Sequence, residues 1–498
     1  MNESRIMPIK PMNKTNTQNA PCIVLGAGPA GLTAAYELSR RRVPAVLLEQ
    51  DCQVGGLART VEYKGYRFDI GGHRFFTKME IVRGLWQTML GDDLLVRPRM
   101  SRIFYRGKFF DYPLKPINAL RNMGIAESLA ILFSYLRSKI APIRPEVSFA
   151  DWVSNRFGRR LYRTFFQTYT EKVWGMPCQS IGAQWAAQRV RGLSLGSALL
   201  NMLLPKWLKT NTKQIRTLID AFYYPRLGPG MMWEAFREAI TSQGGTICLE
   251  SRVTRLVHDG ERIVAVESEQ GSGMVFWPAS QVISTIPLRH LVQALQPPAP
   301  PEVLAAAARL HYRDFLTVAL IIDTADLFPD NWIYVHDDNV RVGRIQNFKN
   351  WSPAMVPDAA RTCLGMEYFC TAGDDLWRMA DQELIALATG ELAAIGLGEP
   401  DRVIDGKVVR MPKAYPVYDE GYPEAFDIVR AYLKRFANLQ VAGRNGMHRY
   451  NNMDHSMLTA ILAVRNICGE RHDLWSINTD EEYHEEGWDM EISSQARL

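Results

Sequence analysis

The sequence predicts an α/β protein in which a nucleotide-binding domain is interleaved with a second, mixed α+β domain. Three observations lead to this prediction. The chain has 498 residues, more than one compact core normally holds. A polar tail precedes a strand, a glycine-rich turn, a helix and a second strand, which is the order of a βαβ nucleotide-binding unit. Alternating strands such as "GGTICLESRVTRLVHDGERIVAVESEQ" then recur far along the chain.

The composition is that of a globular protein and argues against several functions. Hydrophobic residues make up 47% and charged residues 22% of the chain. The net charge of +5 suits an anionic substrate, but no long Lys/Arg block indicates a nucleic-acid partner. Seven scattered cysteines without metal-ligand spacing predict free thiols in a reducing, cytoplasmic compartment, and no metal site.

Two apolar segments, 124–143 and 195–210, carry cationic residues towards their ends. No apolar run reaches the roughly 20 residues needed to span a bilayer. The pattern is typical of helices packed on their own domain, with cations near the negative end of the helix dipole. A peripheral contact with the inner face of a membrane is the alternative. Residues 1–20 lack an apolar core and are expected to be a flexible tail, not a signal peptide.

The stretch "CIVLGAGPAGLTAAYELSRRRVPAVLLEQ" carries a phosphate-binding turn. Gly26 permits the tight turn, Gly28 lets a pyrophosphate approach the backbone, and Gly31 lets the helix pack against the strand. Pro29 and Ala30 begin the helix, whose free N–H groups bind phosphate oxygens. The turn therefore predicts a bound dinucleotide.

The second strand ends at Glu49 and Gln50. A carboxylate there accepts hydrogen bonds from a ribose hydroxyl and disfavours a 2′-phosphate, so FAD or NAD is preferred over NADP. "EQDCQVGGLART" adds a second glycine pair, Gly55 and Gly56, followed by Leu57. This resembles the flavoprotein superfamily of amine oxidases, phytoene desaturases, protoporphyrinogen oxidases and UDP-galactopyranose mutases, in which such a loop closes over the FAD diphosphate. The resemblance implies FAD in a Rossmann-like domain of the glutathione-reductase type, with Gln50, Gly56 and Leu57 beside it.

The chain is expected to divide into two discontinuous domains between its tails. The FAD-binding domain comprises residues 21–99, 223–288 and 405–475, and the substrate domain comprises 100–222 and 289–404. Residues 476–498 form a C-terminal tail. By the resemblance, Val253 packs near the adenine.

"YKGYRFDIGGHRFFTK" places Gly72 and His73 in a glycine turn. Glycines let the backbone pass close to a flat ring, so we expect Gly72 and His73 beside the flavin. A structural histidine bound to a backbone carbonyl is the alternative.

Two segments narrow the resemblance to the UDP-galactopyranose mutases. "YTEKVWGMPCQSIGAQWAAQRVRG" places Trp174 and Arg189 where these mutases have a tryptophan on a mobile substrate loop and an arginine on the diphosphate. "NWIYVHDDNVRVGRIQNFKNWSP" places Tyr334 and Arg344 where they have a substrate tyrosine and a second diphosphate arginine. Two distant arginines can converge on one diphosphate through charge-assisted hydrogen bonds.

The C-terminal third completes the resemblance. "AYPVYDEGY" places Tyr415 near the diphosphate. In "VAGRNGMHRYNNMDHS" the mutase pattern implies that Gly443, Arg444, Tyr450, Asn452 and Met453 line the active site. Many bacterial mutases have Asp at the position of Asn452, so UDP-galactose itself does not follow from the resemblance.

The resulting hypothesis is a flavin-dependent nucleotide-sugar mutase that interconverts pyranose and furanose rings, with N5 of reduced FAD as the nucleophile. An external electron donor would prime it, and a UDP-sugar would be the substrate. His73, Arg189 and Arg344 are the expected catalytic residues, and Trp174, Tyr334, Tyr415 and Tyr450 are expected to bind substrate. One alternative is an FAD-dependent oxidase or desaturase acting on a lipid, a polyprenyl-linked sugar or a porphyrin-like molecule. Another is a flavin-bearing scaffold without activity. The sugar, the base, the electron donor and the oligomeric state stay open.

Overall fold

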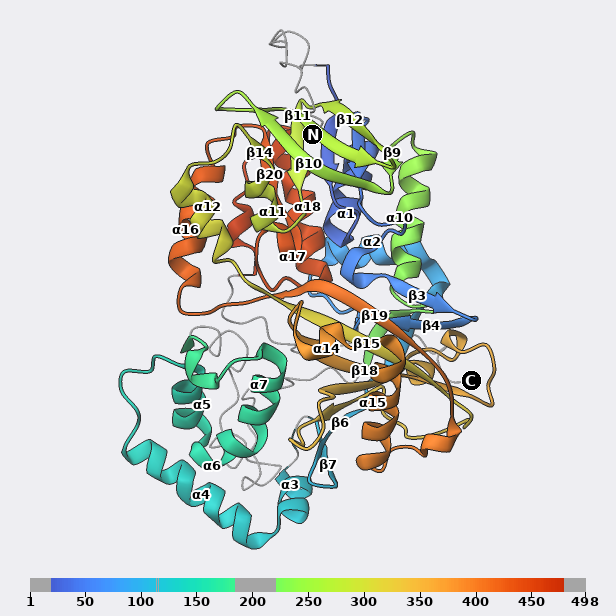
Figure 1. Ribbon diagram of the computed structural model, residues 1–498, viewed down its shortest axis with the longest axis vertical. Coiled ribbons are helices and arrows are strands. Elements are labelled where there is room, and N and C mark those ends of the chain that lie inside the picture. The colour runs from blue at the N-terminus through green and yellow to red at the C-terminus, as the bar shows by residue number, and fades with distance from the viewer. Residues whose placement is uncertain (1–18, 113, 115, 184–220, 479–498) are drawn as a thin grey trace, which may run out of the picture.

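The computed structural model describes residues 19–112, 114, 116–183 and 221–478. A parallel sheet with its helices forms the upper part of the molecule in Figure 1, and a larger mixed sheet flanked by helices forms the lower part. The predicted α/β class, with a dinucleotide-binding domain and an interleaved α+β domain, is confirmed.

The upper part is built on a five-stranded, all-parallel sheet. Its order is β20 (Leu439–Val441), β13 (Gln281–Ser284), β1 (Cys22–Leu25), β2 (Ala45–Leu48) and β9 (Thr246–Cys248). The central strand β1 reads CIVL and is buried throughout, as expected for a parallel strand covered on both faces. Segments from the start, middle and end of the chain thus form one sheet.

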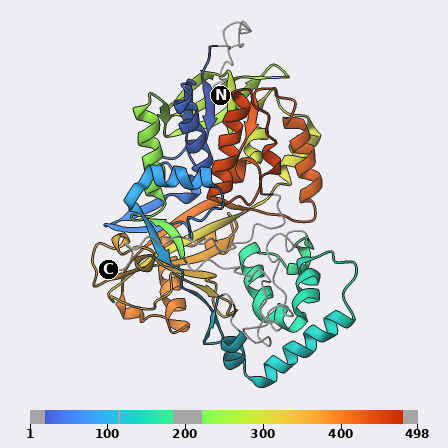
Figure 2. The same cartoon turned by 180° about the vertical axis from the view of Figure 1, so that it is seen from behind.

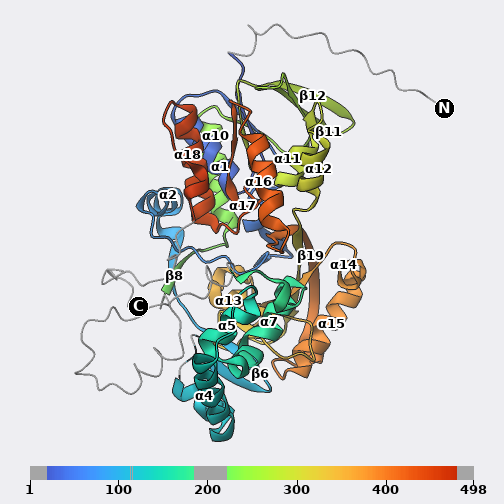
Figure 3. The ribbon, with the colours of Figure 1, turned by 90° about the vertical axis from the view of Figure 1, so that its left-hand side faces the viewer.

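Two layers cover this sheet, as Figure 3 shows. On one side lie α1 (Pro29–Arg40), α10 (Gly230–Ser242) and α18 (Met453–Ile467), which share a core with Val24 of β1. The other side, where Ile23 packs, is covered by a four-stranded sheet and three helices. These are β12 (Gly273–Pro278), β11 (Ile263–Gln270), β10 (Ser251–His258), β14 (Leu295–Gln296), α11 (Leu288–Gln293), α12 (Pro301–Ala308) and α16 (Tyr422–Leu433).

The lower part is built on a seven-stranded sheet. Its order is β19 (Val403–Pro416), β15 (Tyr312–Ile322), β18 (Thr362–Cys370), β17 (Arg344–Asn347), β16 (Trp332–Val335), β6 (Ser101–Tyr105) and β7 (Lys108–Asp111). Neighbouring strands are antiparallel except for the pair β16 and β6. Helix α15 (Asp381–Ala394) packs on one face. Figure 2 shows this sheet below the parallel one from behind.

A group of helices lies beside this sheet at the lower edge of Figure 1. It contains α3 (Pro116–Met123), α4 (Ile125–Ile140), α5 (Phe149–Phe157), α6 (Arg159–Leu161), the π-helical turn Tyr162–Gln167 and α7 (Thr168–Trp174). Their core includes Phe110 of β7. No helix among the described ranges is both long and apolar enough to cross a bilayer.

Short elements join the two parts. They are the hairpin β3 (Thr60–Tyr63) and β4 (Tyr66–Asp69), helix α2 (Glu80–Leu90), and the pair β5 (Leu94–Pro98) and β8 (Ala221–Pro225). The predicted domain boundaries stay a prediction, but two segments would move under the observed sheets. Residues 405–416 belong to the long strand β19 of the lower sheet, and residues 289–308 pack with the upper part. Strand β19 crosses the predicted boundary at residue 405 without a break in its hydrophobic pattern, so the sequence gives no signal of a boundary there.

Candidate functional site

The turn between β1 and α1 packs tightly against the helix at Gly31 and leaves its backbone accessible at Gly28. Gly26 has φ +94°, and its N–H donates to Leu48 O at 2.8 Å. A Cβ on Gly31 would overlap the carbonyl oxygen of Gly26, so only glycine lets the helix approach. Apart from its neighbours in the chain, no atom of the described residues lies within 4 Å of the position that a Cβ on Gly28 would take. A pyrophosphate can therefore approach the backbone there.

The second glycine loop lies on the first. Gly55 and Gly56 have φ +103° and +53°, and the Gly55 N–H donates to Ala27 O at 2.8 Å. A Cβ on Gly56 would lie 3.1 Å from the Cα of Gly28. Leu57 follows and is partly buried. The two loops form one backbone surface around the open position.

A third segment reaches the same turn from the end of the chain. Gly443 begins the short helix α17 (Gly443–Gly446) with φ +83°, and a Cβ there would lie 2.8 Å from the Cβ of Ala30. The Gly443 N–H donates to Thr459 Oγ1 of α18 at 3.0 Å. Gly443 therefore lies directly against Ala30, which follows Pro29 at the start of α1.

The carboxylate of Glu49 ends β2 and is buried. Its Oε2 accepts a hydrogen bond from the Ala27 N–H at 2.6 Å, and its pKa is raised by burial, which the backbone amides oppose. Gln50 is exposed beside it. Glu49 O also accepts from Ser251 N at 2.7 Å, two residues before the partly buried Val253 of β10. An open pyrophosphate position, a carboxylate for ribose and an apolar side chain for adenine together fit FAD.

The Gly71–Gly72 turn after β4 lies against β17. Gly71 has φ +95°, and a Cβ there would be 3.7 Å from Nη2 of Arg344. A Cβ on Gly72 would be 2.8 Å from Nε2 of Gln346. The turn thus brings His73, 271 positions before Arg344 in the chain, to the same side of the lower sheet.

His73 is partly buried, and its Nδ1 has no hydrogen-bond partner in the described part of the chain. Burial, and then the positive charges of Arg344 and Arg444, lower the pKa of His73 to about 4. The imidazole is therefore neutral near pH 7 and can donate or accept one hydrogen bond.

Arg344 is held by a buried carboxylate. Its Nε donates to Glu367, whose other oxygen accepts from Gln346 Nε2 at 2.8 Å. Glu367 is fully buried, while the side chain of Arg344 is 18% exposed. Burial opposes the charge of Arg344, but Glu367 and the neighbouring tyrosines outweigh it and raise the pKa of Arg344. Since only Nε is bound in the described structure, the Nη edge can bind an anion.

Aromatic rings surround this guanidinium. Tyr415 stacks on Tyr450 with centroids 5.7 Å apart and lies edge-on to Trp174 at 6.4 Å. Tyr334 lies edge-on to Tyr169 at 5.5 Å. Burial raises the pKa of Tyr415 and of Tyr169 above the usual value, so their hydroxyls stay protonated and can donate.

Arg444 lies against the rings of Tyr415 and Tyr450. Its Nε donates to Ala414 O at 2.9 Å and its Nη1 to Asn451 O at 3.3 Å. The guanidinium lies 3.9 Å from the ring centroid of Tyr450 and 5.0 Å from that of Tyr415. No carboxylate of the described residues pairs with it. Its charge therefore stays uncompensated within the site, which favours an anionic or electron-rich ligand.

The N-terminus of α18 follows this arginine. Asn452 is exposed at the N-cap without a side-chain capping bond, and Met453, the first helical residue, is partly buried. The first N–H groups of a helix have no partner within the helix, so this end can donate to a ligand.

Trp174 differs from the loop position that the resemblance implies. It is the last residue of α7 and is buried, with Gly175 next in a left-handed conformation. Lys172 Nζ donates to Val342 O at 3.3 Å and to Asp337 O, which fixes α7 on the lower sheet. Arg189 lies outside the described residues, so its convergence with Arg344 stays a prediction.

Two residues of this site are absent from the predicted set. Glu367 is the single acid in the apolar strand TCLGMEYFC, a signal for a buried, paired carboxylate. Tyr169 precedes the TEK sequence by one residue and carries no such signal. Within the described ranges, no group of His, Cys, Asp and Glu is arranged to hold a metal ion.

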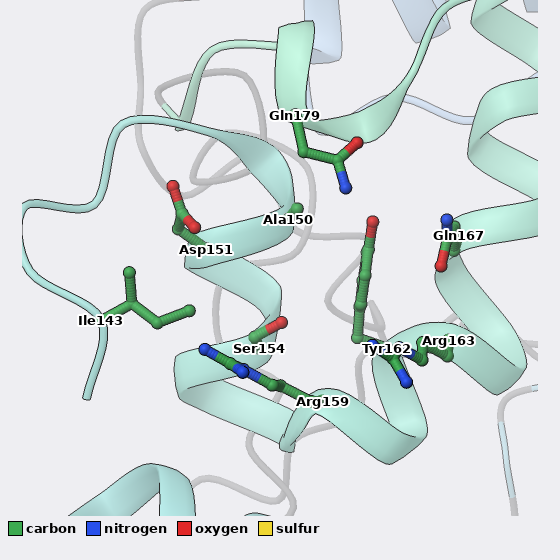
Figure 4. Close-up of a pocket in the computed structure, with 9 residues that line it drawn as sticks. All are labelled: Ile143, Ala150, Asp151, Ser154, Arg159, Tyr162, Arg163, Gln167 and Gln179. Carbon is green, nitrogen blue, oxygen red and sulfur yellow. The ribbon is translucent and has the colours of Figure 1, made fainter. Parts of the chain in front are cut away.

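A separate pocket of about 250 Å³ lies among the lower helices. In Figure 4, Tyr162 and Gln179 approach it from different segments. Its lining residues are Ile143, Ala150, Asp151, Ser154, Arg159, Tyr162, Arg163, Gln167 and Gln179. None of the predicted site residues is among them.

The chain is similar to known flavoproteins over most of its length. A family model described as flavin containing amine oxidoreductase matches residues 29–468. A Mycobacterium tuberculosis protein named as a candidate flavin-containing monoamine oxidase, AofH, is 26% identical over 295 residues. That match covers 56% of this chain and 60% of the length of that relative.

Two further similarities cover more of the chain. Coproporphyrinogen III oxidase of Mycobacterium leprae is 24% identical over 460 residues, which are 86% of this chain and 94% of that protein. The crystal structure of reduced UDP-galactopyranose mutase has a TM-score of 0.78 at 21% identity and covers 91% of this chain and 97% of that one. At this identity the structural similarity concerns the fold.

Proposed function

The chain belongs to the flavin containing amine oxidoreductase family, and we propose that within this family it is a redox-neutral nucleotide-sugar mutase. It is an FAD-dependent enzyme, and the predicted cofactor is confirmed. The proposed reaction interconverts the pyranose and furanose rings of a UDP-sugar. The fold similarity to UDP-galactopyranose mutase supports this proposal, as do the site contacts below.

The observation that carries the proposal is the Arg344–Glu367 pair beneath the Gly71–Gly72 turn. A hydride-removing site for an apolar substrate has no need for a buried carboxylate that orients an arginine. Here Glu367 binds Nε, so the two Nη atoms are positioned for a bidentate contact with a phosphate. Burial raises the pKa of Tyr415 and of Tyr169 beside it, so these two hydroxyls keep their protons and can donate to the remaining oxygens.

The chain's own groups would serve the departure of a nucleotide diphosphate. Reduced FAD, when bound, supplies a nucleophilic N5 for displacement at the anomeric carbon. Arg344 and the hydroxyl groups of Tyr334 and Tyr415 would stabilise the charge that develops on the diphosphate. Neutral His73, whose pKa a contact with the Gly71 backbone raises less than burial lowers it, could hold or transfer a proton at a sugar hydroxyl.

A flavin-dependent oxidase or desaturase is the second candidate, because several of the relatives with similar sequences carry such names. They include the monoamine oxidase and coproporphyrinogen III oxidase above and the phytoene desaturase of Pantoea ananas. The packed aromatic rings of Tyr415, Tyr450 and Trp174 could contact a flat or apolar substrate as well as a sugar ring.

One experiment separates the two candidates. The purified protein, with FAD either oxidised or reduced by dithionite, is incubated anaerobically with UDP-hexopyranoses and UDP-pentopyranoses, and the ring forms are separated by anion-exchange chromatography. The mutase proposal expects a furanose product only with the reduced protein and without net consumption of reductant. A parallel aerobic incubation offers the oxidised protein a lipid or a porphyrinogen. Oxygen uptake and peroxide formation there, and no furanose from any nucleotide sugar in the anaerobic samples, would support the oxidase instead.

A further inference from the structure

The outer side of α3 and α4 exposes an unusual concentration of apolar side chains. Eight of the sixteen large hydrophobic side chains that are exposed in the described residues lie on these two helices. Ile125 is 80% exposed, Phe133 68% and Ile140 85%. We define this α3–α4 face by Ile117, Leu120, Ile125, Leu129, Leu132, Phe133, Leu136 and Ile140. Exposed patches of this kind mark an interaction surface.

Helix α4 is amphipathic, but its apolar side is turned outward. At about 100° per residue, its six exposed hydrophobic residues fall within an arc of roughly 100°. The opposite side carries the contacts with the protein: Ile131 and Ser138 are buried, and Ser134 Oγ accepts from Arg160 N at 3.0 Å. A Cβ on Gly158 would lie 2.7 Å from Tyr135 N, so the helix approaches its neighbour through its small and polar residues. Its apolar stripe therefore faces away from the rest of the described chain.

The charges around the face are predominantly positive. Arg137 and Lys139 fall at the two edges of the stripe, and exposed Arg121 and Arg144 lie on α3 and just after α4. The nearby acids are neutralised by other arginines. Glu127 pairs with Arg160 at 2.6 Å, and Glu146 pairs with Arg156 at 2.9 Å.

We propose that the α3–α4 face docks the protein onto the anionic surface of a lipid bilayer. An apolar stripe flanked by cations matches acyl chains beneath anionic headgroups, with the long Arg and Lys side chains reaching the phosphates. The 16 residues of α4 extend about 24 Å and can lie along the surface, since the helix is not long and apolar enough to cross it. This inference is independent of the mutase proposal.

A second copy of the chain fits this face less well. A two-fold interface places the same surface opposite itself, so the arginines at its edges would approach those of the partner. Like charges brought together at an interface are unfavourable. A lipid surface supplies the opposite charge, and Figure 1 shows α4 at the extremity of the molecule, away from the parallel sheet.

Vesicle flotation with the full-length holoprotein tests the proposal. Large unilamellar vesicles of phosphatidylcholine alone are compared with vesicles that contain one third phosphatidylglycerol. Leu129→Gln with Phe133→Gln should lower binding to the anionic vesicles about tenfold or more, because two exposed apolar anchors are removed. Arg121→Gln with Arg137→Gln should also weaken it, and the wild-type binding should fall with added salt.

The control changes two exposed apolar residues elsewhere on the molecule, one of them again a phenylalanine. Met274 and Phe276 of β12 are 57% and 43% exposed, so Met274→Gln with Phe276→Gln should float like the wild type. Carbene footprinting adds a readout without substitutions: Leu129 and Phe133 should be labelled in the free protein and protected by anionic vesicles.

Three results would overturn the proposal. The first is no flotation of the wild type with either vesicle, and the second is equal flotation of the wild type and the Leu129/Phe133 variant. The third is a concentration-dependent dimer that the same variant abolishes, which would assign the face to a second copy. Protection of Leu129 and Phe133 without vesicles in a monomer would likewise count against it, because another segment of the chain would then cover them.

Discussion

The two ends of the candidate site bind by different means. At the dinucleotide end the contacts come from backbone: Gly26, Gly28 and Gly31 form one turn within six residues, and two other glycine segments lie on it. At the substrate end the contacts come from side chains on the Gly71–His73 turn, the four strands β16 to β19, helix α7 and the α17–α18 region. The glycine turn depends on the absence of side chains, and the substrate end depends on specific side chains. Adding a side chain should therefore damage the first end, and removing one should damage the second.

The largest effect is expected where a buried ion pair is broken. Glu367→Leu leaves Arg344 charged without its carboxylate, and Arg344→Met leaves Glu367 fully buried and unpaired. Each should lower the free energy of unfolding by about 3–5 kcal/mol, whereas the double variant should lie close to the wild type. Urea titrations followed by circular dichroism measure the three values.

The double variant also separates folding from binding. It should retain FAD, but UDP affinity measured by calorimetry should fall about 10- to 100-fold because the charged hydrogen bonds are lost. Arg341→Met is the matched control, since Arg341 pairs with Asp375 at 2.8 Å instead. Unchanged UDP affinity in the double variant would exclude Arg344 from the diphosphate site and contradict its proposed role.

A glycine at the dinucleotide end should give the next largest effect. Gly31→Ala would force its Cβ onto the carbonyl oxygen of Gly26, and because this neighbour is backbone it cannot turn away. We expect a loss of about 3 kcal/mol and release of the flavin, measured by thermal unfolding and absorbance near 450 nm. Gly84→Ala in α2 is the control: no atom lies near its Cβ position, so it should be neutral or slightly stabilising. Equal behaviour of the two variants would refute the close-packing explanation.

The same contrast explains which features the sequence predicts. Glycine spacing is a local signal, and it predicted the dinucleotide turn and the α/β class, because each depends on residues close together in the chain. FAD followed from the resemblance that the second glycine pair carries, and it is confirmed. The boundary at residue 405 and the place of Trp174 depend on long-range contacts. Strand β19 carries the chain from the lower sheet towards α16, and Lys172 holds α7 on the distant 335–342 segment.

The candidate substrate residues show an intermediate case. The resemblance placed His73, Arg344, Tyr415 and Arg444 in one site, and the structure brings them together, although their roles stay proposals. Glu367 was not predicted because its function is to position a residue on the neighbouring strand. Only the pairing of β17 with β18, which sets Arg344 opposite Glu367, makes that relation visible.

A smaller effect separates binding from folding at the dinucleotide end. Gly28→Ala adds a methyl group where no protein atom lies within 4 Å, so the free energy of unfolding of the apoprotein should stay close to that of the wild type. The methyl group would occupy the place of approach of the pyrophosphate. We expect FAD affinity to fall about tenfold or more, or at least about 1.4 kcal/mol, in a fluorescence titration of apoprotein with FAD. A loss of stability without loss of affinity would show that Gly28 serves the fold and not the cofactor.

The smallest effect concerns pH and a histidine behind the substrate end. His336 is buried, and its ring stacks on that of Tyr169 with the centroids 4.8 Å apart. Burial, together with the positive charge of Lys172, lowers the pKa of His336 to about 3. Between this value and the ordinary value of about 6.5, the unfolded chain binds a proton that the folded chain does not, so stability falls as pH decreases through that range.

His336→Phe keeps a stacking ring and removes this contribution to the pH dependence. It should reduce the loss of unfolding free energy between pH 7.5 and 5.5 by about 1 kcal/mol. Urea titrations at both pH values, with His311→Asn as a control because that ring is largely exposed, measure the difference. An identical pH dependence in the wild type and His336→Phe would mean that the pKa of the His336 imidazole is the same in the folded and the unfolded chain, which would contradict a neutral ring stacked on Tyr169 at pH 5.5.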